Sequence, residues 1–177
     1  MLLSLAKFMR VVRIDPVARV AVVQPGVRNA AISDVVAPFG LYYAPDPSSQ
    51  IACSIGGNVA ENSGGVHCLK YGLTVHNVLR VRGYTIDGEP VDFGSEALDS
   101  AGYDLLALAI GSEGLLAVTT EVTVKLLPKP EAARVIMASF DDVEKAGDAV
   151  AAVIGAGIIP AGLELSLIHI SEPTRPY

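Results

Sequence analysis

The spacing of hydrophobic and polar positions changes along the chain between the two periods that distinguish strands from helices. Short runs of apolar and β-branched residues predict strands at 20–23, 41–43, 77–86, 89–93 and 115–127. Apolar residues three and four positions apart predict a helix at 28–39 and a shorter one at 104–109. Gly40 and Gly111 follow these two segments as helix stops. Asp87-Gly88 lies between two predicted strands and is a hairpin signal.

The pattern restarts after the Pro-Lys-Pro sequence at 128–130, which suggests a boundary between two domains. Beyond the boundary the spacing predicts a strand, a helix and a second strand, at 134–140, 142–156 and 158–163. Asp141 is the expected N-cap of that helix. This βαβ-like unit would begin a second domain.

The last residues, 165–177, share neither the period nor the composition of the chain before them. Their sequence, LSLIHISEPTRPY, reads like the translation of an adaptor used in sequencing libraries. We therefore expect this tail to carry no biological role, and no site residue is taken from it.

The composition predicts a packed core and narrows the classes of partner. The chain has 177 residues, of which 51% are hydrophobic, enough for one domain and part of another. Its net charge is −6 with Lys and Arg scattered, which argues against nucleic acid or an anionic membrane surface as a partner. The apolar run at 149–159 is shorter than the roughly 20 residues of a membrane span, so no transmembrane segment is expected.

The two cysteines, Cys53 and Cys68, lack the paired spacing of a zinc site, and no metal is expected. Reduced thiols in a cytoplasmic protein are the favoured interpretation, with a disulfide as the open alternative. The N-terminal sequence does not have the order of charged, apolar and small residues of a signal peptide.

The segment 45–65, PDPSSQIACSIGGNVAENSGG, combines Gly, Asn and Ser and contains neither Lys nor Arg. Glycine lets the backbone approach a ligand closely, and successive N–H groups in glycine-rich turns can form an anion-binding concavity. Asparagine adds side-chain donors and acceptors. Ordinary structural turns explain the same composition, so both interpretations stay open on these grounds.

Other stretches could converge on the same ligand, notably 70–78 and 111–130. In the second of these, Gly111 and Gly114 flank Ser112 and Glu113 directly before a predicted strand. Backbone atoms can contact a flat ring at such a place, although an ordinary helix-to-strand turn remains the alternative.

Four longer sequence segments, in this order along the chain, carry a resemblance to known proteins: VVQPGVRN, YYAPDPSSQIACSIGGNVAENSGGVHCLKYGLTVHNVL, GSEGLLAVTTEVTVKLLPKP and MASFDDVEKAGDAVAAVI. They resemble the vanillyl-alcohol oxidase / p-cresol methylhydroxylase superfamily, and most of all the family of glycolate oxidase FAD-binding subunits and D-lactate dehydrogenases. The resemblance implies an α+β fold: the second α/β subdomain of a p-cresol methylhydroxylase-type FAD-binding domain at 1–128. The start of a C-terminal FAD-linked oxidase domain is implied at 131–164. The family's diphosphate loop and substrate domain lie outside these strings, so the chain is expected to be an internal fragment.

The resemblance also implies a function. Its members oxidise 2-hydroxy acids such as glycolate or D-lactate to 2-oxo acids with FAD as cofactor, and the fragment alone is expected to be inactive. Partner subunits, among them an iron–sulfur subunit, are implied, as is a cytoplasmic location or a peripheral one at the inner membrane through those subunits. A non-catalytic FAD-binding accessory subunit and a UDP-N-acetylmuramate-type flavin reductase remain as alternatives.

No catalytic residue is assigned, because the substrate domain is expected to lie elsewhere. The resemblance implies these cofactor-binding residues: Pro45, Asp46, Pro47, Ser48, Ser49, Gly56, Gly57, Asn58, Asn62, Gly64, Gly65, Asn77, Val78, Glu113, Gly114 and Val118. His67 and Cys68 could each be a covalent flavin attachment point. We favour a packed or hydrogen-bonded His67 over attachment.

Overall fold

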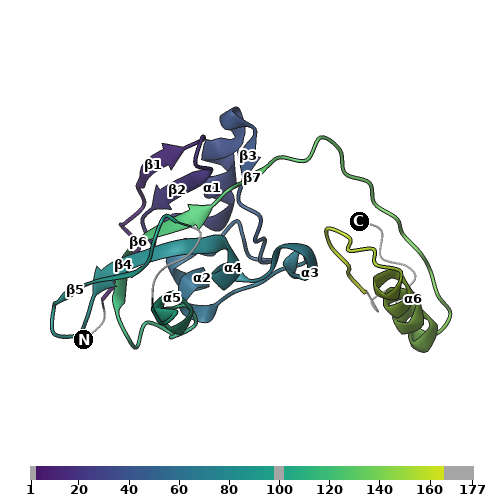
Figure 1. The fold of residues 1–177 in the computed structure, drawn as a ribbon. Helices are drawn as coiled ribbons and strands as arrows, with labels where there is room; N and C mark the ends of the chain where they lie inside the picture. The colour runs from purple at the N-terminus through teal and green to yellow at the C-terminus, as the bar shows by residue number, and fades with distance from the viewer. Residues whose placement is uncertain (1–2, 98–101, 166–177) are drawn as a thin grey trace.

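The computed structural model describes residues 3–97 and 102–165, and it has the α+β architecture that the sequence predicts (Figure 1). A five-stranded sheet has the order β1-β2-β6-β4-β5, and all neighbouring strands are antiparallel. The strands are β1 Val11–Asp15, β2 Val20–Val23, β6 Val118–Lys125, β4 Val78–Tyr84 and β5 Pro90–Gly94. The tail at 165–177, which is expected to have no biological role, lies outside the described residues from 166 onward.

The first helix ends where the sequence predicts. Helix α1 (Asn29–Val36) continues as a short 3-10 helix, η1 (Ala37–Phe39), and Gly40 follows with φ 69°. Only glycine adopts this left-handed conformation without steric cost, so Gly40 stops the helix. The chain then enters β3 (Leu41–Tyr42), which pairs with β7 (Leu127–Pro128) to form a separate two-stranded sheet.

The hairpin prediction is also confirmed. Strands β4 and β5 pair in antiparallel register, and Gly88 in the turn has φ 79°. Pro90 begins β5 at the edge of the sheet, where its missing N–H removes no ladder hydrogen bond. After it comes helix α5 (Leu105–Ala109), whose N-cap Asp104 accepts a 2.9 Å hydrogen bond from the Ala107 amide.

The core lies between the sheet and the helices. Most of its largest fully buried side chains are aliphatic and come from α1, α2 and strands β2, β4 and β6, among them Val23, Ile32, Val36, Ile55, Val81, Val122 and Val124. Each such side chain stabilises the fold by roughly 1.5–3 kcal/mol relative to an exposed one. Branched aliphatic residues therefore make up most of the core, with Tyr43 as a buried aromatic among them.

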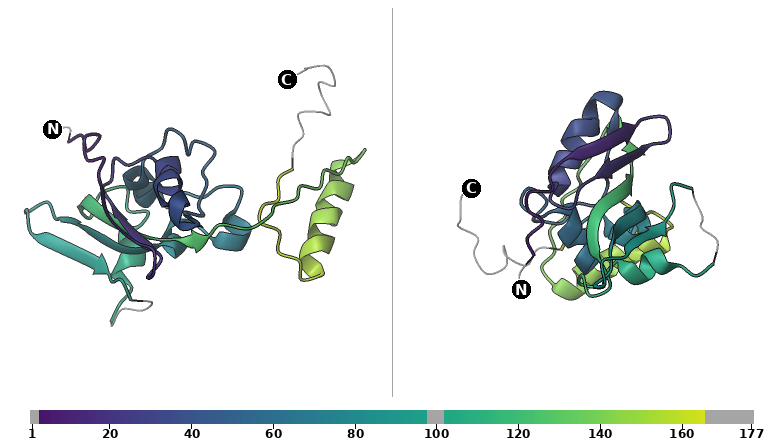
Figure 2. Two further views of the ribbon diagram at one scale, coloured as in Figure 1. Left: turned by 90° about the horizontal axis from the view of Figure 1, so that it is seen from above. Right: turned by 90° about the vertical axis from the view of Figure 1, so that its left-hand side faces the viewer.

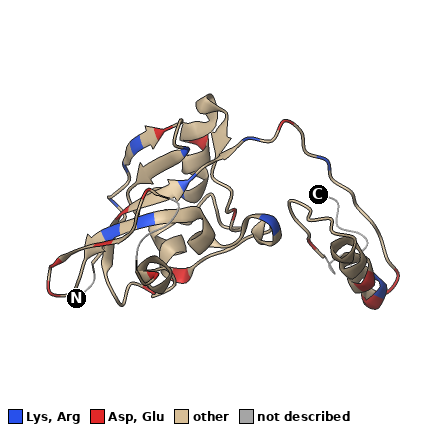
Figure 3. Cartoon of the chain, viewed as in Figure 1, with Lys and Arg blue, Asp and Glu red and all other residues tan. Residues whose placement is uncertain are grey.

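The polar face of the sheet carries ion pairs instead. Arg80 and Arg82 on β4 both contact Asp92 on β5, and Arg82 also lies 3.4 Å from Glu121 on β6. Figure 3 shows the basic positions along β4 and the acidic ones around them. Opposite charges on adjacent strands support the pairing of this face.

The glycine-rich segment contains more regular structure than its composition suggests. Residues Ile55–Glu61 form helix α2, capped by Ser54, whose Oγ accepts a hydrogen bond from the Gly57 amide. Two further single-turn helices follow, α3 (Cys68–Tyr71) and α4 (Thr74–Asn77). Two adjacent glycines disfavour a helix locally, so tertiary contacts must supply the stability that α2 lacks by itself.

The strands predicted after residue 130 are wrong. Helix α6 (Val143–Gly155) forms between two stretches without strand pairing, and Val135, Ile136 and Met137 are 92–93% exposed. These stretches belong to an arm that leaves the five-stranded sheet (Figure 2), so no neighbouring strand satisfies their backbone groups. The arm returns to the body at Gly162, where a Cβ would lie 2.7 Å from Val66 Cγ1.

The N-cap of α6 also differs from the prediction by one residue. Asp142, and not Asp141, accepts the capping hydrogen bond from the Glu144 amide, at 2.9 Å. Asp141 instead lies 2.9 Å from Lys145 Nζ, one helical turn later. Among the helices of the described residues, none is long and apolar enough to cross a membrane.

The ion pairs on β4 and β5 predict a pH-dependent stability. The hydrogen bond from Arg80, with the positive charges of Arg80 and Arg82, holds the pKa of Asp92 below its ordinary 3.8. The stabilisation is therefore present above about pH 4 and is lost as the pH falls through the lower folded-state pKa. Because the Asp92 side chain is 40% exposed, Asp92→Asn should cost at most about 1 kcal/mol near neutral pH.

Urea unfolding at several pH values measures this difference in the free energy of unfolding. Asp87→Asn in the hairpin turn is the control, since no ion pair involves Asp87 in the described part of the chain. A difference between wild type and Asp92→Asn that persists unchanged in acid would contradict the assignment.

Candidate functional site

A cavity of about 580 Å³ opens between α2, the turn after β2, the loop before β6 and the N-terminal segment. Its volume lies in the range of small-molecule sites, roughly 300–1,000 Å³. Much of its wall is made by residues with short side chains, among them Gly26, Ser54, Gly56, Gly57, Ala60 and Gly114. Backbone therefore lies close to the open space, as the shape of a flat ligand requires.

Hydrogen bonds between distant segments build this wall. The Gly111 amide donates to the Val59 carbonyl at 2.8 Å, and the Glu113 amide donates to the Ala60 carbonyl at 3.0 Å. The loop before β6 is thus attached to α2. Gly56, Gly57, Gly114 and Val118, all predicted site residues, line the cavity together as a result.

The amide groups at the start of α2 are already used by the protein. Gly56 N donates to Pro25 O at 2.9 Å, Gly57 N to Ser54 Oγ at 3.3 Å, and Asn58 N to Ser54 O at 3.0 Å. At these three positions the amides are therefore bonded within the protein instead of pointing free into a concavity. The glycines contribute shape: a Cβ on Gly56 would lie 2.6 Å from Pro25 Cβ, whereas one on Gly57 has Ser54 Oγ, 3.5 Å away, as its nearest neighbour.

Three predicted polar residues are turned into the protein. Asn58 is 2% exposed, and its Nδ2 donates to Asn29 Oδ1 at 2.9 Å. Asn77 is 1% exposed and donates to the carbonyls of Tyr71 and Leu73. Asn62 ends α2 with φ 49°, and its Oδ1 accepts from the Val75 amide at 3.0 Å. These side chains hold segments together and do not line the cavity.

The remaining predicted residues divide between turns and the core. Val78 is buried in β4, and Glu113 is exposed with φ 54° in the loop before β6. Ser48 and Ser49 are exposed in a turn, where the Pro47 carbonyl accepts from the Gln50 amide at 2.8 Å. Pro45 is buried, and its carbonyl accepts from Asn29 Nδ2 at 2.8 Å.

Gly64 and Gly65 allow two segments to lie against each other. A Cβ on Gly65 would collide with the Asp46 carbonyl, and one on Gly64 would collide with Cys68 Sγ. The Gly65 amide donates to Cys68 Sγ at 2.9 Å. This pair of glycines therefore brings the chain before α3 onto the segment that contains Asp46.

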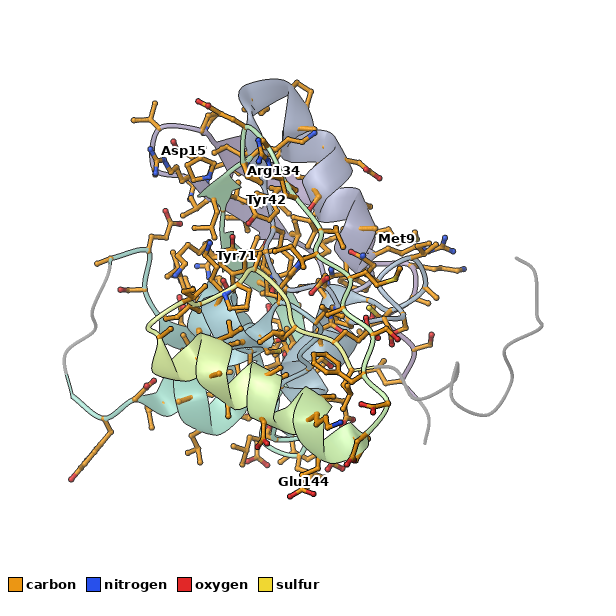
Figure 4. The ribbon with its side chains drawn as sticks, turned by 90° about the vertical axis from the view of Figure 1, so that its right-hand side faces the viewer. Met9, Asp15, Tyr42, Tyr71, Arg134 and Glu144 are labelled. Carbon is orange, nitrogen blue, oxygen red and sulfur yellow. The ribbon has the colours of Figure 1, made fainter. Side chains whose placement is uncertain are left out.

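A cluster of ionisable side chains lies at that contact. His67 Nδ1 lies 2.9 Å from Asp46 Oδ2, although the approach is not aligned for a hydrogen bond, and the His67 amide donates to Asp46 Oδ1 at 3.2 Å. The ring of Tyr71 stands edge-on to those of His67 and Tyr42, as Figure 4 shows for the tyrosines. Burial and the hydrogen bond with Tyr71 raise the pKa of Tyr42. His67 is thus packed against Tyr71, and its backbone amide holds it to Asp46.

Sequence reasoning missed several lining residues. Pro25, Gly26 and Arg28 face the cavity from the turn after β2, and Arg28 brings a positive charge to it. A Pro-Gly pair is a common turn signal, but no local signal places this turn beside α2. Leu3, Leu5 and Met9 of the N-terminal segment contribute apolar surface, likewise through tertiary contact alone.

Two family models match the chain. A model described as an FAD binding domain matches residues 1–94, and one described as the C-terminal domain of FAD linked oxidases matches residues 129–166. The fold has a counterpart in the solved structure of an alkyldihydroxyacetonephosphate synthase. The TM-score is 0.74 at 22% identity over 89% of this chain and 28% of that one.

Several curated proteins are similar in sequence. Glycolate oxidase subunit GlcD of Escherichia coli K12 is 70% identical over 164 residues, which are 93% of this chain and 33% of that protein. The GlcD subunit of Bacillus subtilis is 42% identical over 93% of the chain and 34% of its own length. A D-lactate dehydrogenase of Archaeoglobus fulgidus is 36% identical over 85% of the chain and 34% of its own length. The chain therefore spans about a third of the length of these relatives.

The surroundings of Gly56 and Gly57 predict that alanine substitutions at these neighbouring positions have opposite effects on the free energy of unfolding. Gly56→Ala should lower the free energy of unfolding by roughly 1–3 kcal/mol, because its Cβ meets Pro25. Gly57→Ala should raise it by roughly 0.5–1 kcal/mol, because alanine favours the helix and its Cβ meets no close neighbour. Urea unfolding followed by circular dichroism compares the two, and equal effects would contradict the packing described above.

Proposed function

Because the chain belongs to the FAD-binding domain family, we propose that it is part of an FAD-dependent oxidoreductase that converts a 2-hydroxy acid to a 2-oxo acid. The cofactor is FAD. The observation that carries the proposal is the cavity beside α2, where glycines from two distant segments line one space.

The residues of the cavity fit a flavin nucleotide in shape and in charge. Gly57 and Gly114 leave room for a flat group close to the backbone, and Val118 offers an apolar contact. Arg28 adds a positive charge suited to a diphosphate. Since the α2 amides are engaged within the protein, we propose that packing and this cation hold the cofactor more than backbone N–H donation does.

The remaining predicted residues take a supporting role in this proposal. Asn58, Asn62 and Asn77 hold the segments that form the site, and Gly64 and Gly65 bring Asp46 close to α3. The segment that leads to α2 is shaped by Pro45, Pro47, Ser48 and Ser49. Val78 is buried at the start of β4, and Glu113 lies in the loop that is bonded to α2. When bound, FAD supplies the chemistry of accepting a hydride, and the protein binds and orients it.

The substrate class follows from what the relatives' names share. Glycolate and D-lactate, which appear in those names, each carry a hydroxyl group beside a carboxylate. We propose glycolate or D-lactate as the substrate of the protein to which this chain belongs. The name of the GlcD relatives calls them subunits, which supports a proposal of partner subunits, with an iron–sulfur protein among them.

We also propose the division of the chain and its location. Residues 1–128 would form part of the FAD-binding domain, and residues 131–164 the start of the oxidase C-terminal domain. The proposed location is cytoplasmic, with peripheral attachment to the inner membrane through partner subunits as the alternative.

The reaction is tested in a protein that contains this chain together with the remaining two thirds of the relatives' length. Glycolate and D-lactate are added without oxygen to the FAD-loaded protein, and loss of the visible flavin absorption is followed. Bleaching by either acid supports the dehydrogenase. Stable flavin with every 2-hydroxy acid supports the accessory-subunit alternative, and bleaching by a nicotinamide nucleotide alone supports the flavin reductase.

Gly57→Val should weaken FAD binding while the fold is kept. The new side chain enters the cavity, and its Cβ has no closer neighbour than Ser54 Oγ at 3.5 Å. We expect at least about a tenfold rise in the dissociation constant, measured by quenching of FAD fluorescence on titration with protein. Gly147→Val in α6 is the matched control, because that helical glycine also has open space and lies far from the cavity in sequence. Unchanged affinity in Gly57→Val would remove this residue from the site.

A further inference from the structure

We infer that Asn29 is a positioning residue for the cofactor cavity, an inference that rests on the proposed function. Asn29 is 1% exposed at the first position of α1, and nothing in its local sequence marks it as functional. It touches no open space. Its importance follows from the three segments that it joins.

Each polar group of Asn29 bonds a different part of the chain. Its amide N–H donates to Cys53 O at 3.0 Å, directly before the Ser54 cap of α2. Its Nδ2 donates to Pro45 O at 2.8 Å, and its Oδ1 accepts from Asn58 Nδ2, inside α2, at 2.9 Å. One buried side chain thus fixes α2 relative to the segment at 45–49.

The same contacts connect the two walls of the cavity. Arg28, the residue before Asn29, faces the cavity and forms an isolated bridge with Ser54. Gly57, the residue before Asn58, also lines the cavity. The Asn29–Asn58 hydrogen bond therefore adds a buried side-chain link to the backbone bonds that join the wall at 25–28 to α2, from the Gly56 amide to the Pro25 carbonyl and from the Ile55 amide to the Val27 carbonyl.

Removing this link leaves specific groups without partners. In Asn29→Leu, whose side chain has the same number and branching of heavy atoms, the Pro45 carbonyl and the side-chain amide of Asn58 stay buried without these hydrogen bonds. A buried unpaired group is costly, so the two segments should shift until water or other groups satisfy them. A shift of α2 moves Gly57 relative to Arg28 and changes the space available to FAD.

The test separates positioning from general stability. FAD is titrated into a protein that contains this chain together with the remaining two thirds of the relatives' length, in the wild-type form and as Asn29→Leu, at a temperature where both are folded by circular dichroism. We expect at least about a tenfold loss of affinity in Asn29→Leu. Val36→Ala, at the other end of the same helix and fully buried away from the cavity, should lose stability and keep wild-type affinity. If Asn29→Leu behaves like Val36→Ala, the inference is wrong.

A double-mutant cycle supplies a second test. Asn58→Leu should also weaken FAD binding, and the double variant Asn29→Leu/Asn58→Leu should lose less affinity than the product of the single losses, because both partners of the shared bond are then gone. Independent, multiplying effects would contradict the proposed link. If Asn29→Leu does not fold, Asn29→Ser, whose hydroxyl can replace only part of the network, takes its place.

Amide hydrogen exchange tests the inference without FAD. The amides of Gly56 and Gly57, which donate to Pro25 O and Ser54 Oγ, should exchange faster in Asn29→Leu and not in Val36→Ala. Failure of the wild-type protein of the relatives' full length to bind FAD would count against the proposed function, whereas unchanged exchange at these amides would count against the role of Asn29.

Discussion

The contact between Gly56 and Pro25 is the constraint on which the candidate site depends. The Gly56 amide bonds the Pro25 carbonyl, and no Cβ fits between the two residues. This contact holds α2 against the turn after β2, and β2 is in turn held by its ladders to β1 and β6. The cavity exists because a short glycine-containing helix lies at backbone distance from the sheet and is kept there by hydrogen bonds to its neighbours.

Many polar groups around the cavity are hydrogen-bonded to other parts of the protein. The amides at the start of α2 donate hydrogen bonds within the protein. The side chains of Asn29 and Asn58 are buried outside the cavity lining and are hydrogen-bonded to each other. The site therefore offers a defined shape, one lining cation in Arg28 and few free donors. Such a surface suits a large cofactor with a flat ring system, because burial of the ring faces is favourable and polar contacts are needed only at the ring edge and at the charged part.

The sequence predicted well those elements that local chemistry determines. The hairpin at Asp87-Gly88 and the stop at Gly40 each depend on the conformational preference of one or two residues. Helix α2 was missed because its glycines oppose a helix, and its stability comes from Pro25, Ser54 and the core. The strands at 134–140 and 158–163 were wrong because a strand needs a partner, which periodicity alone cannot supply.

For the site, the sequence by itself determined the residue types: glycines at 56, 57 and 114, a core of branched aliphatics, and ordered strings that resemble an FAD-binding family. Only the tertiary structure decided which of them face the cavity and which serve as internal links. Gly57 faces the open space while Asn58, the next residue, is buried against Asn29, because the helix turns successive side chains toward different neighbours. Arg28 and Asn29 join the site through contacts that span up to 29 positions of sequence, a distance over which no local pattern carries information.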